Sequence, residues 1–197
     1  MENIYIKVAP KLGEFQVASS LNSNIELQLV QDFIDDPNHI QPFFAYLRHH
    51  PEAKIKVIHS PLHQGEDIDW DDILHPKTNQ IIHQTCELAQ MMATRTHQAI
   101  PVIFHFGGQS HKIQETPLLR EAYLTEINQL VHQYPDVLFY LENVTIVSVL
   151  QQKNKIHFRD ASVETVPEFV SWLTEALNLP HRFYSVLDTC HTIMVCR

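Results

Sequence analysis

Histidine and carboxylate side chains stand at the ends of several apolar runs in this sequence of 197 residues. These ligand-type residues are His59, His105, Glu142, Asp188 and, three positions later, His191. If the runs are parallel strands, their carboxyl ends meet at one rim and bring these residues together. Imidazole nitrogen and carboxylate oxygen suit Zn²⁺, Mn²⁺ and Fe²⁺. The pattern therefore predicts a divalent-metal site, with zinc as the first expectation and manganese or iron as alternatives.

Each of these residues, taken alone, has a simpler interpretation. A single histidine at a strand end more often packs or lies half exposed than binds a metal. A carboxylate at the same place can cap the helix that follows. Asp188 followed by Thr189 also suits a turn. The recurrence at the same place in four successive runs favours the functional interpretation.

The runs that carry these residues belong to an alternation of strands and helices. Short runs rich in β-branched and aromatic residues predict strands over 4–8, 25–30, 54–58, 100–104, 137–141 and 183–187. Apolar residues at helical spacing predict helices over 40–47, over about 79–97, from Thr116 and from Thr165. The segment 151–161 is expected to be a polar excursion between the strand at 137–141 and the helix that begins at Thr165.

We expect the whole chain, 1–197, to form a single α/β domain, because no linker interrupts the alternation. Near-continuous apolar strands predict a parallel sheet covered on both faces. No dinucleotide or P-loop sequence follows the first run, which favours a barrel over a doubly wound sheet. A complete TIM-type (β/α) barrel has eight strands and about 250 residues. The chain is thus expected to be C-terminally short, with about six βα units and the last two strands missing.

Composition and charge narrow the partners and the compartment. The formal charge is −9, and no basic patch suggests a phosphate-backbone contact. No run reaches the length of a membrane span, and the first residues lack the features of a signal peptide. Three irregularly spaced cysteines do not make a disulfide framework. We therefore expect a cytoplasmic protein with no membrane contact. A homo-oligomer that covers the open edges of the short barrel is a further expectation.

Four segments together resemble a known group of enzymes. They are His59-Ser60-Pro61, His105-Phe106-Gly107, Glu142-Asn143 and Asp188-Thr189-Cys190-His191. They are similar to motifs of the xylose isomerase-like TIM-barrel superfamily, and most of all to its endonuclease IV branch, the family 2 AP endonucleases. The resemblance covers roughly 54–194 by motif and the earlier part only by the order of strands.

The resemblance implies a role for each matching residue. His59, His105 and Glu142 would hold one metal ion, and Glu142, the candidate catalytic residue, would bridge to a second ion that Asp188 also binds. His191 would serve a third ion or the substrate. The superfamily's last two strands supply further ligands, and this chain has no counterpart of them.

Three other residues are candidates for contact with a substrate. Trp70 lies in an acidic loop that is either a solvated connection or a lid on which a sugar or base stacks. Gly107 either allows a phosphate to approach the backbone or simply forms a turn. Asn143 either binds substrate or shapes the pocket beside Glu142.

Three functions remain open from the sequence. The first is a metal-dependent phosphodiesterase of the endonuclease IV type, acting on abasic DNA. The second is a sugar or sugar-phosphate isomerase or epimerase of the same superfamily, in which Glu142 would assist proton transfer. The third is a non-catalytic barrel fragment that serves in binding or oligomerisation.

Overall fold

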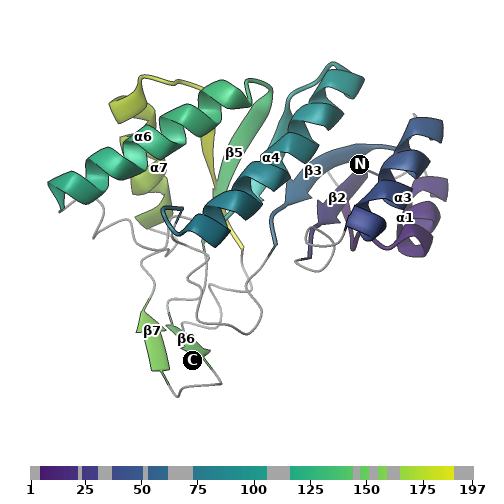
Figure 1. Cartoon of the computed structure of the whole chain (residues 1–197), viewed down its shortest axis with the longest axis horizontal. Helices are drawn as coiled ribbons and strands as arrows, with labels where there is room; N and C mark the ends of the chain where they lie inside the picture. The colour runs from purple at the N-terminus through teal and green to yellow at the C-terminus, as the bar shows by residue number, and fades with distance from the viewer. Residues whose placement is uncertain are drawn as a thin grey trace.

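Strands and helices alternate along the chain (Figure 1). The computed structural model describes residues 5–21, 24–30, 37–50, 53–61, 73–105, 116–143, 147–150, 155–158 and 165–188. The strands of the main sheet are β1 (Tyr5–Val8), β2 (Asn24–Gln28), β3 (Ile55–His59), β4 (Ile100–Phe104), β5 (Val137–Glu142) and β8 (Phe183–Val186). The helices are α1 (Leu12–Ser20), α3 (Pro37–His49), α4 (Pro76–Thr96), α6 (Pro117–Gln133) and α7 (Thr165–Leu177).

The main sheet contains six strands in the order β1-β2-β3-β4-β5-β8, and every neighbouring pair is parallel. The spatial order follows the chain order without a reversal. Because βα crossovers are right-handed, such an order brings all the helices to one face of the sheet. This arrangement agrees with part of a (β/α) barrel and not with a doubly wound sheet. Within the described residues, β1 and β8 each have a single neighbouring strand.

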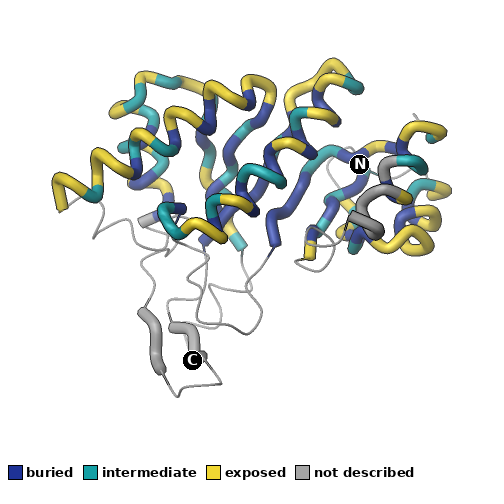
Figure 2. Tube along the Cα trace, viewed as in Figure 1, coloured by how far each residue is buried: buried dark blue, intermediate teal, exposed yellow. Residues whose placement is uncertain are grey.

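The two faces of the sheet differ in burial, as strand β2 illustrates. Ile25 and Leu27 are fully buried against the helices, whereas Glu26 and Gln28, which alternate with them, are only partly buried. Successive side chains of a strand point to opposite faces, so Glu26 and Gln28 lie on the inner face, away from the helices. Figure 2 shows the fully buried core between sheet and helices. The side chains of the predicted site lie at the strand ends, on this inner face of the sheet.

Part of the predicted polar excursion is a strand. β6 (Val147–Leu150) pairs antiparallel with β7 (Lys155–Phe158) in a separate two-stranded sheet. The prediction for 151–161 is therefore wrong over 155–158. A hairpin forms by local backbone pairing between neighbouring segments and needs no long apolar run, so hydrophobic patterning alone does not reveal it.

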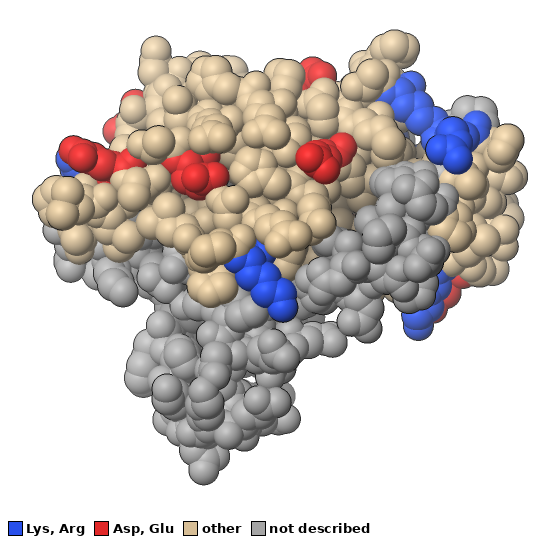
Figure 3. All heavy atoms as spheres, viewed as in Figure 1, with Lys and Arg blue, Asp and Glu red and all other residues tan. Residues whose placement is uncertain are grey.

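Basic side chains are few on the face of the molecule that Figure 3 shows. In this view, the Lys and Arg side chains of the described residues form small groups and no continuous stripe. None of the described helices combines the length and the apolar character that crossing a membrane demands.

Candidate metal centre

Three adjacent strands of the sheet end in the side chains His59, His105 and Glu142. His59 is the last residue of β3, His105 directly follows β4, and Glu142 is the last residue of β5. All three are buried, with at most 6% of their surface exposed. Hydrogen bonds extend the sheet at this rim, since Leu29 N–H donates to the His59 carbonyl at 2.9 Å. The three side chains therefore project from a backbone that is fixed on both sides.

The ligand atoms of this triad form a small triangle. His105 Nε2 lies 2.9 Å from Glu142 Oε2, and His59 Nε2 lies 3.5 Å from the same oxygen. The two Nε2 atoms are 3.3 Å apart. A tetrahedral zinc ion with bonds of about 2.0–2.1 Å has ligand atoms about 3.3 Å apart. The triangle thus has the dimensions of one face of such a tetrahedron, and its donor types fit a divalent metal.

The charges within the triad support one another in the metal-free state. Burial alone would raise the pKa of Glu142, but hydrogen bonds from His105 and His59 outweigh it and hold that pKa well below its usual value. Burial alone would lower the pKa of His59, but hydrogen bonds to Glu142 and Glu26 outweigh it and raise that pKa. The lowered pKa of Glu142 and the raised pKa of His59 both favour the charged forms of this pair in the metal-free state.

Two residues that the sequence analysis did not select extend this cluster toward the edge of the sheet. Glu26 Oε1 on β2 lies 3.0 Å from His59 Nδ1. Lys7 Nζ on β1 lies 2.8 Å from Glu26 Oε1 and 3.0 Å from His59 Nδ1. The signal was present in the strict alternation of apolar and polar residues over 25–29, which places Glu26 on the inner face.

Asp188 and Asn143 lie next to the triad but outside it. Among the described residues, the group whose ligand atoms all lie within 4.8 Å contains His59, His105 and Glu142, and does not include Asp188. The Asn143 side chain is buried and binds the backbone of Asp188, accepting from its N–H at 2.6 Å and donating to its carbonyl at 3.0 Å. Asn143 thereby connects β8 to the end of β5. Its predicted contact with a substrate, and metal binding by Asp188, stay predictions.

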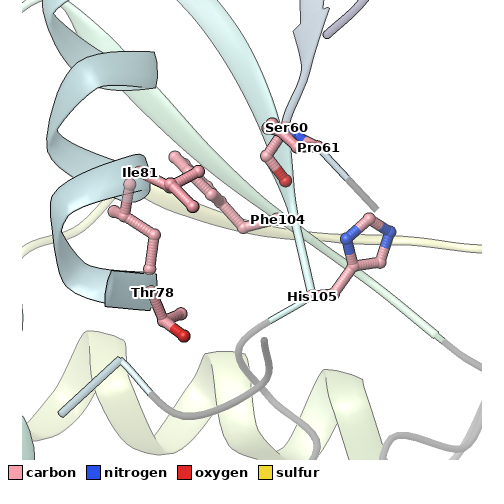
Figure 4. A pocket seen from close by; sticks show the side chains of 7 residues that line it. Ser60, Pro61, Thr78, Ile81, Phe104 and His105 are labelled. Atoms are coloured by element: carbon pink, nitrogen blue, oxygen red, sulfur yellow. The ribbon is translucent and has the colours of Figure 1, made fainter. Parts of the chain in front are cut away.

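A small pocket lies on the helix side of the centre (Figure 4). The ends of β3 and β4 and the first turns of α4 form it, and its lining includes Ser60, Thr78, Phe104 and His105. The pocket has room for about one water molecule. Among the described residues, the centre is therefore closely packed toward α4.

Three of the predicted site residues lie outside the described parts of the chain. They are Trp70, Gly107 and His191. Their predicted roles in substrate contact and metal binding stay predictions.

Comparison with known proteins supports the fold and leaves the family open. No protein-family model matches the chain, and no curated protein matches it. The solved structure of TTHB071 protein from Thermus thermophilus, soaked with ZnCl2, is similar with a TM-score of 0.58. The two chains are 17% identical, and the match covers 97% of this chain and 68% of the other. At this identity the likeness bears on the fold alone.

Proposed function

We propose that this protein binds a divalent metal, zinc first, through His59, His105 and Glu142 and acts as a metal-dependent hydrolase of phosphate esters. The observation that carries the proposal is the triangle of two imidazole nitrogens and one carboxylate oxygen, buried at the rim of a parallel sheet. Active sites of barrel enzymes are built at this rim. The solved neighbour soaked with zinc chloride is compatible with zinc as the metal.

The number of ligands favours a catalytic over a structural metal. Structural zinc sites are closed by four protein ligands, whereas catalytic sites have three protein ligands and an open position. The described residues offer a group of three. A divalent metal in such a site lowers the pKa of a bound water and polarises a phosphoryl oxygen. The three side chains, held by burial and by the sheet, set the position of that chemistry.

The substrate class is the finer part of the proposal. The motifs at His59, His105 and Glu142 favour an endonuclease IV-type phosphodiesterase that acts on abasic DNA. The formal charge of −9 favours a small sugar phosphate, the substrate of an isomerase or epimerase. The proposal ranks hydrolysis first because the group of three ligands leaves a coordination position open for water.

Metal analysis of the purified chain tests the proposal. We expect near-stoichiometric zinc, manganese or iron by mass spectrometry, and a loss of that metal in His105→Ala. The control is His132→Ala, which removes an exposed histidine of α6. A wild-type chain that stays metal-free after reconstitution would refute the proposal. Metal-loaded protein is then assayed with abasic-site DNA and with sugar phosphates to separate the two substrate classes.

A further inference from the structure

Glu26 and Lys7 contact the ring nitrogen of His59 that faces away from the triad. His59 uses Nε2 toward His105 and Glu142, while Nδ1 is 3.0 Å from both Glu26 Oε1 and Lys7 Nζ. The His59 side chain is 3% exposed and that of Glu26 is 19% exposed, whereas that of Lys7 is 52% exposed. An acceptor and a donor thus approach the same nitrogen from neighbouring strands.

These two neighbours favour opposite tautomers of His59. A histidine that binds a metal through Nε2 carries its proton on Nδ1. With Glu26 as acceptor, Nδ1–H donates to the carboxylate, and the lone pair of Nε2 is free for a metal. With Lys7 as donor, Nδ1 accepts, the proton sits on Nε2, and the metal position is blocked. Which contact dominates therefore decides whether His59 can act as a ligand.

The Glu26 carboxylate is well suited to be the acceptor. Its Oε1 faces the ring nitrogen at 3.0 Å and has the Lys7 ammonium beside it. Lys7 Nζ is also closer to Glu26 Oε1, at 2.8 Å, than to the ring. Lys7 can therefore bind the carboxylate while Nδ1–H donates to the same group.

We propose that Glu26 is a positioning residue that selects the metal-binding tautomer of His59, with Lys7 serving only as the counter-ion of Glu26. This inference rests on the proposed function, because it concerns the same metal. An ordinary ion pair is the competing explanation, since a pair with a half-exposed lysine contributes little to stability and would not affect the metal.

Zinc affinity of the full chain, measured by competition with a chromophoric chelator, tests the inference. Glu26→Gln replaces the carboxylate by a neutral amide of nearly the same shape, and we expect it to weaken zinc binding about 10- to 100-fold, the range typical for outer partners of ligating histidines. Lys7→Met should leave the affinity within about threefold, as expected for a counter-ion that is largely solvent-screened. The matched control is Glu14→Gln on α1, where the Glu14 carboxylate lies 3.7 Å from Nζ of Lys11, the residue before the helix.

A measurement on the wild-type chain supports the test if a variant folds poorly. Nitrogen NMR of the histidine rings in the metal-free chain, at a pH where His59 is neutral, should place the proton of His59 on Nδ1. The cobalt-substituted protein should change its visible spectrum in Glu26→Gln and not in Glu14→Gln. If Glu26 only took part in an ion pair, the neutral ring of the metal-free chain would not prefer the proton on Nδ1, and the cobalt spectrum would be unchanged in Glu26→Gln.

The outcomes separate this inference from the proposed function. A wild-type chain without zinc overturns the metal site itself. A wild-type chain that binds zinc, with Glu26→Gln equally tight, overturns the role of Glu26 and leaves the metal site intact. If Lys7→Met weakens zinc as much as Glu26→Gln does, Lys7 is more than a counter-ion and the assignment of tautomer choice to Glu26 is wrong.

Discussion

Polar side chains near the strand ends are buried in the middle of the sheet and partly exposed at its edges. In the middle, β3, β4 and β5 present three buried groups that contact one another. At one edge, Lys7 of β1 has 52% of its side chain exposed. At the other, Asp188 follows β8 in a partly exposed position. Polar residues occur at both places, but among the described residues the group whose ligand atoms lie within 4.8 Å of one another comes from the middle strands.

The difference comes from what surrounds each strand. Strands β3 to β5 have neighbours on both sides, and α4, which has nine buried residues, packs on β4 and β5. The edge strand β1 is flanked by α1, which buries only Phe15 and Ala18. Packing restricts rotamers and excludes water, and both effects fix a side chain in place. We infer that two-sided packing, rather than residue type, turns a strand end into a candidate site.

The largest expected effect is the loss of stability when the middle of the sheet is opened. Phe139 is fully buried on β5 and stacks on Phe104 of β4 at 5.7 Å. We expect Phe139→Ala to lower the free energy of unfolding by about 3–5 kcal/mol, measured by urea denaturation of the metal-free chain. Tyr5→Ala, at an edge position that is 42% exposed, should cost about 1 kcal/mol or less. Similar costs at both positions would contradict the distinction between middle and edge.

The middle strands could be predicted well because their apolar runs are bounded by polar residues. The prediction for β4 agrees with the structure at both ends, and that for β5 is one residue short. Helix α4 begins at Pro76, three residues before the prediction, because proline suits the first helical turn. The hairpin of β6 and β7 could not be predicted, since its backbone pairing leaves little trace in the hydrophobic pattern.

The candidate site could be predicted only in part. His59, His105 and Glu142 share one structural position, the end of an apolar strand, and that repetition was visible in the sequence. Glu26 lies in the middle of its strand, so it does not share the strand-end position that identified the other three residues. Its role depends on the register that places β2 beside β3, where Glu26 pairs with Val57 and Gln28 with His59. The pairing register of two strands depends on tertiary packing, and a single sequence does not reveal it.

The next effect in size is the loss of metal when the triad is changed without changing its shape. Glu142→Gln keeps the size of the side chain but removes the charge next to both histidines. We expect zinc affinity to fall by about 100-fold or more, beyond the range typical for outer partners, in the same chelator competition. Glu126→Gln, which alters a partly exposed carboxylate beside His83 between α4 and α6, should leave the affinity unchanged. An equal loss in both variants would indicate a general effect of charge.

A smaller effect concerns the pH dependence of stability in the metal-free chain. The lowered pKa of Glu142 adds stability above its ordinary value of 4.5, which is lost as pH falls through the lowered pKa. The raised pKa of His59 adds stability below its ordinary value of 6.5, which is lost as pH rises through the raised pKa. With a chelator present, the triad should therefore stabilise the fold most between about pH 4.5 and 6.5.

Thermal unfolding across pH checks this window. Glu142→Gln should flatten the maximum, whereas Glu14→Gln on α1 should not. Zinc should add most of its stabilisation above about pH 6.5, because the ligating histidines must be neutral. A wild-type chain in chelator whose stability rises steadily from about pH 6 to 8 would contradict the ion pairing within the triad.

The smallest expected effect is at the edge, where Asp188 follows β8. Because its carboxylate is not part of the compact group, we expect Asp188→Asn to change the affinity for the first zinc ion less than tenfold. Asn143→Ala, which releases the backbone of Asp188 from β5, should have an effect of similar size. If titration reveals a second, weaker zinc ion, Asp188→Asn should remove that ion and spare the first. Loss of the first ion in Asp188→Asn would show that the edge strand contributes to the centre as directly as the middle strands do.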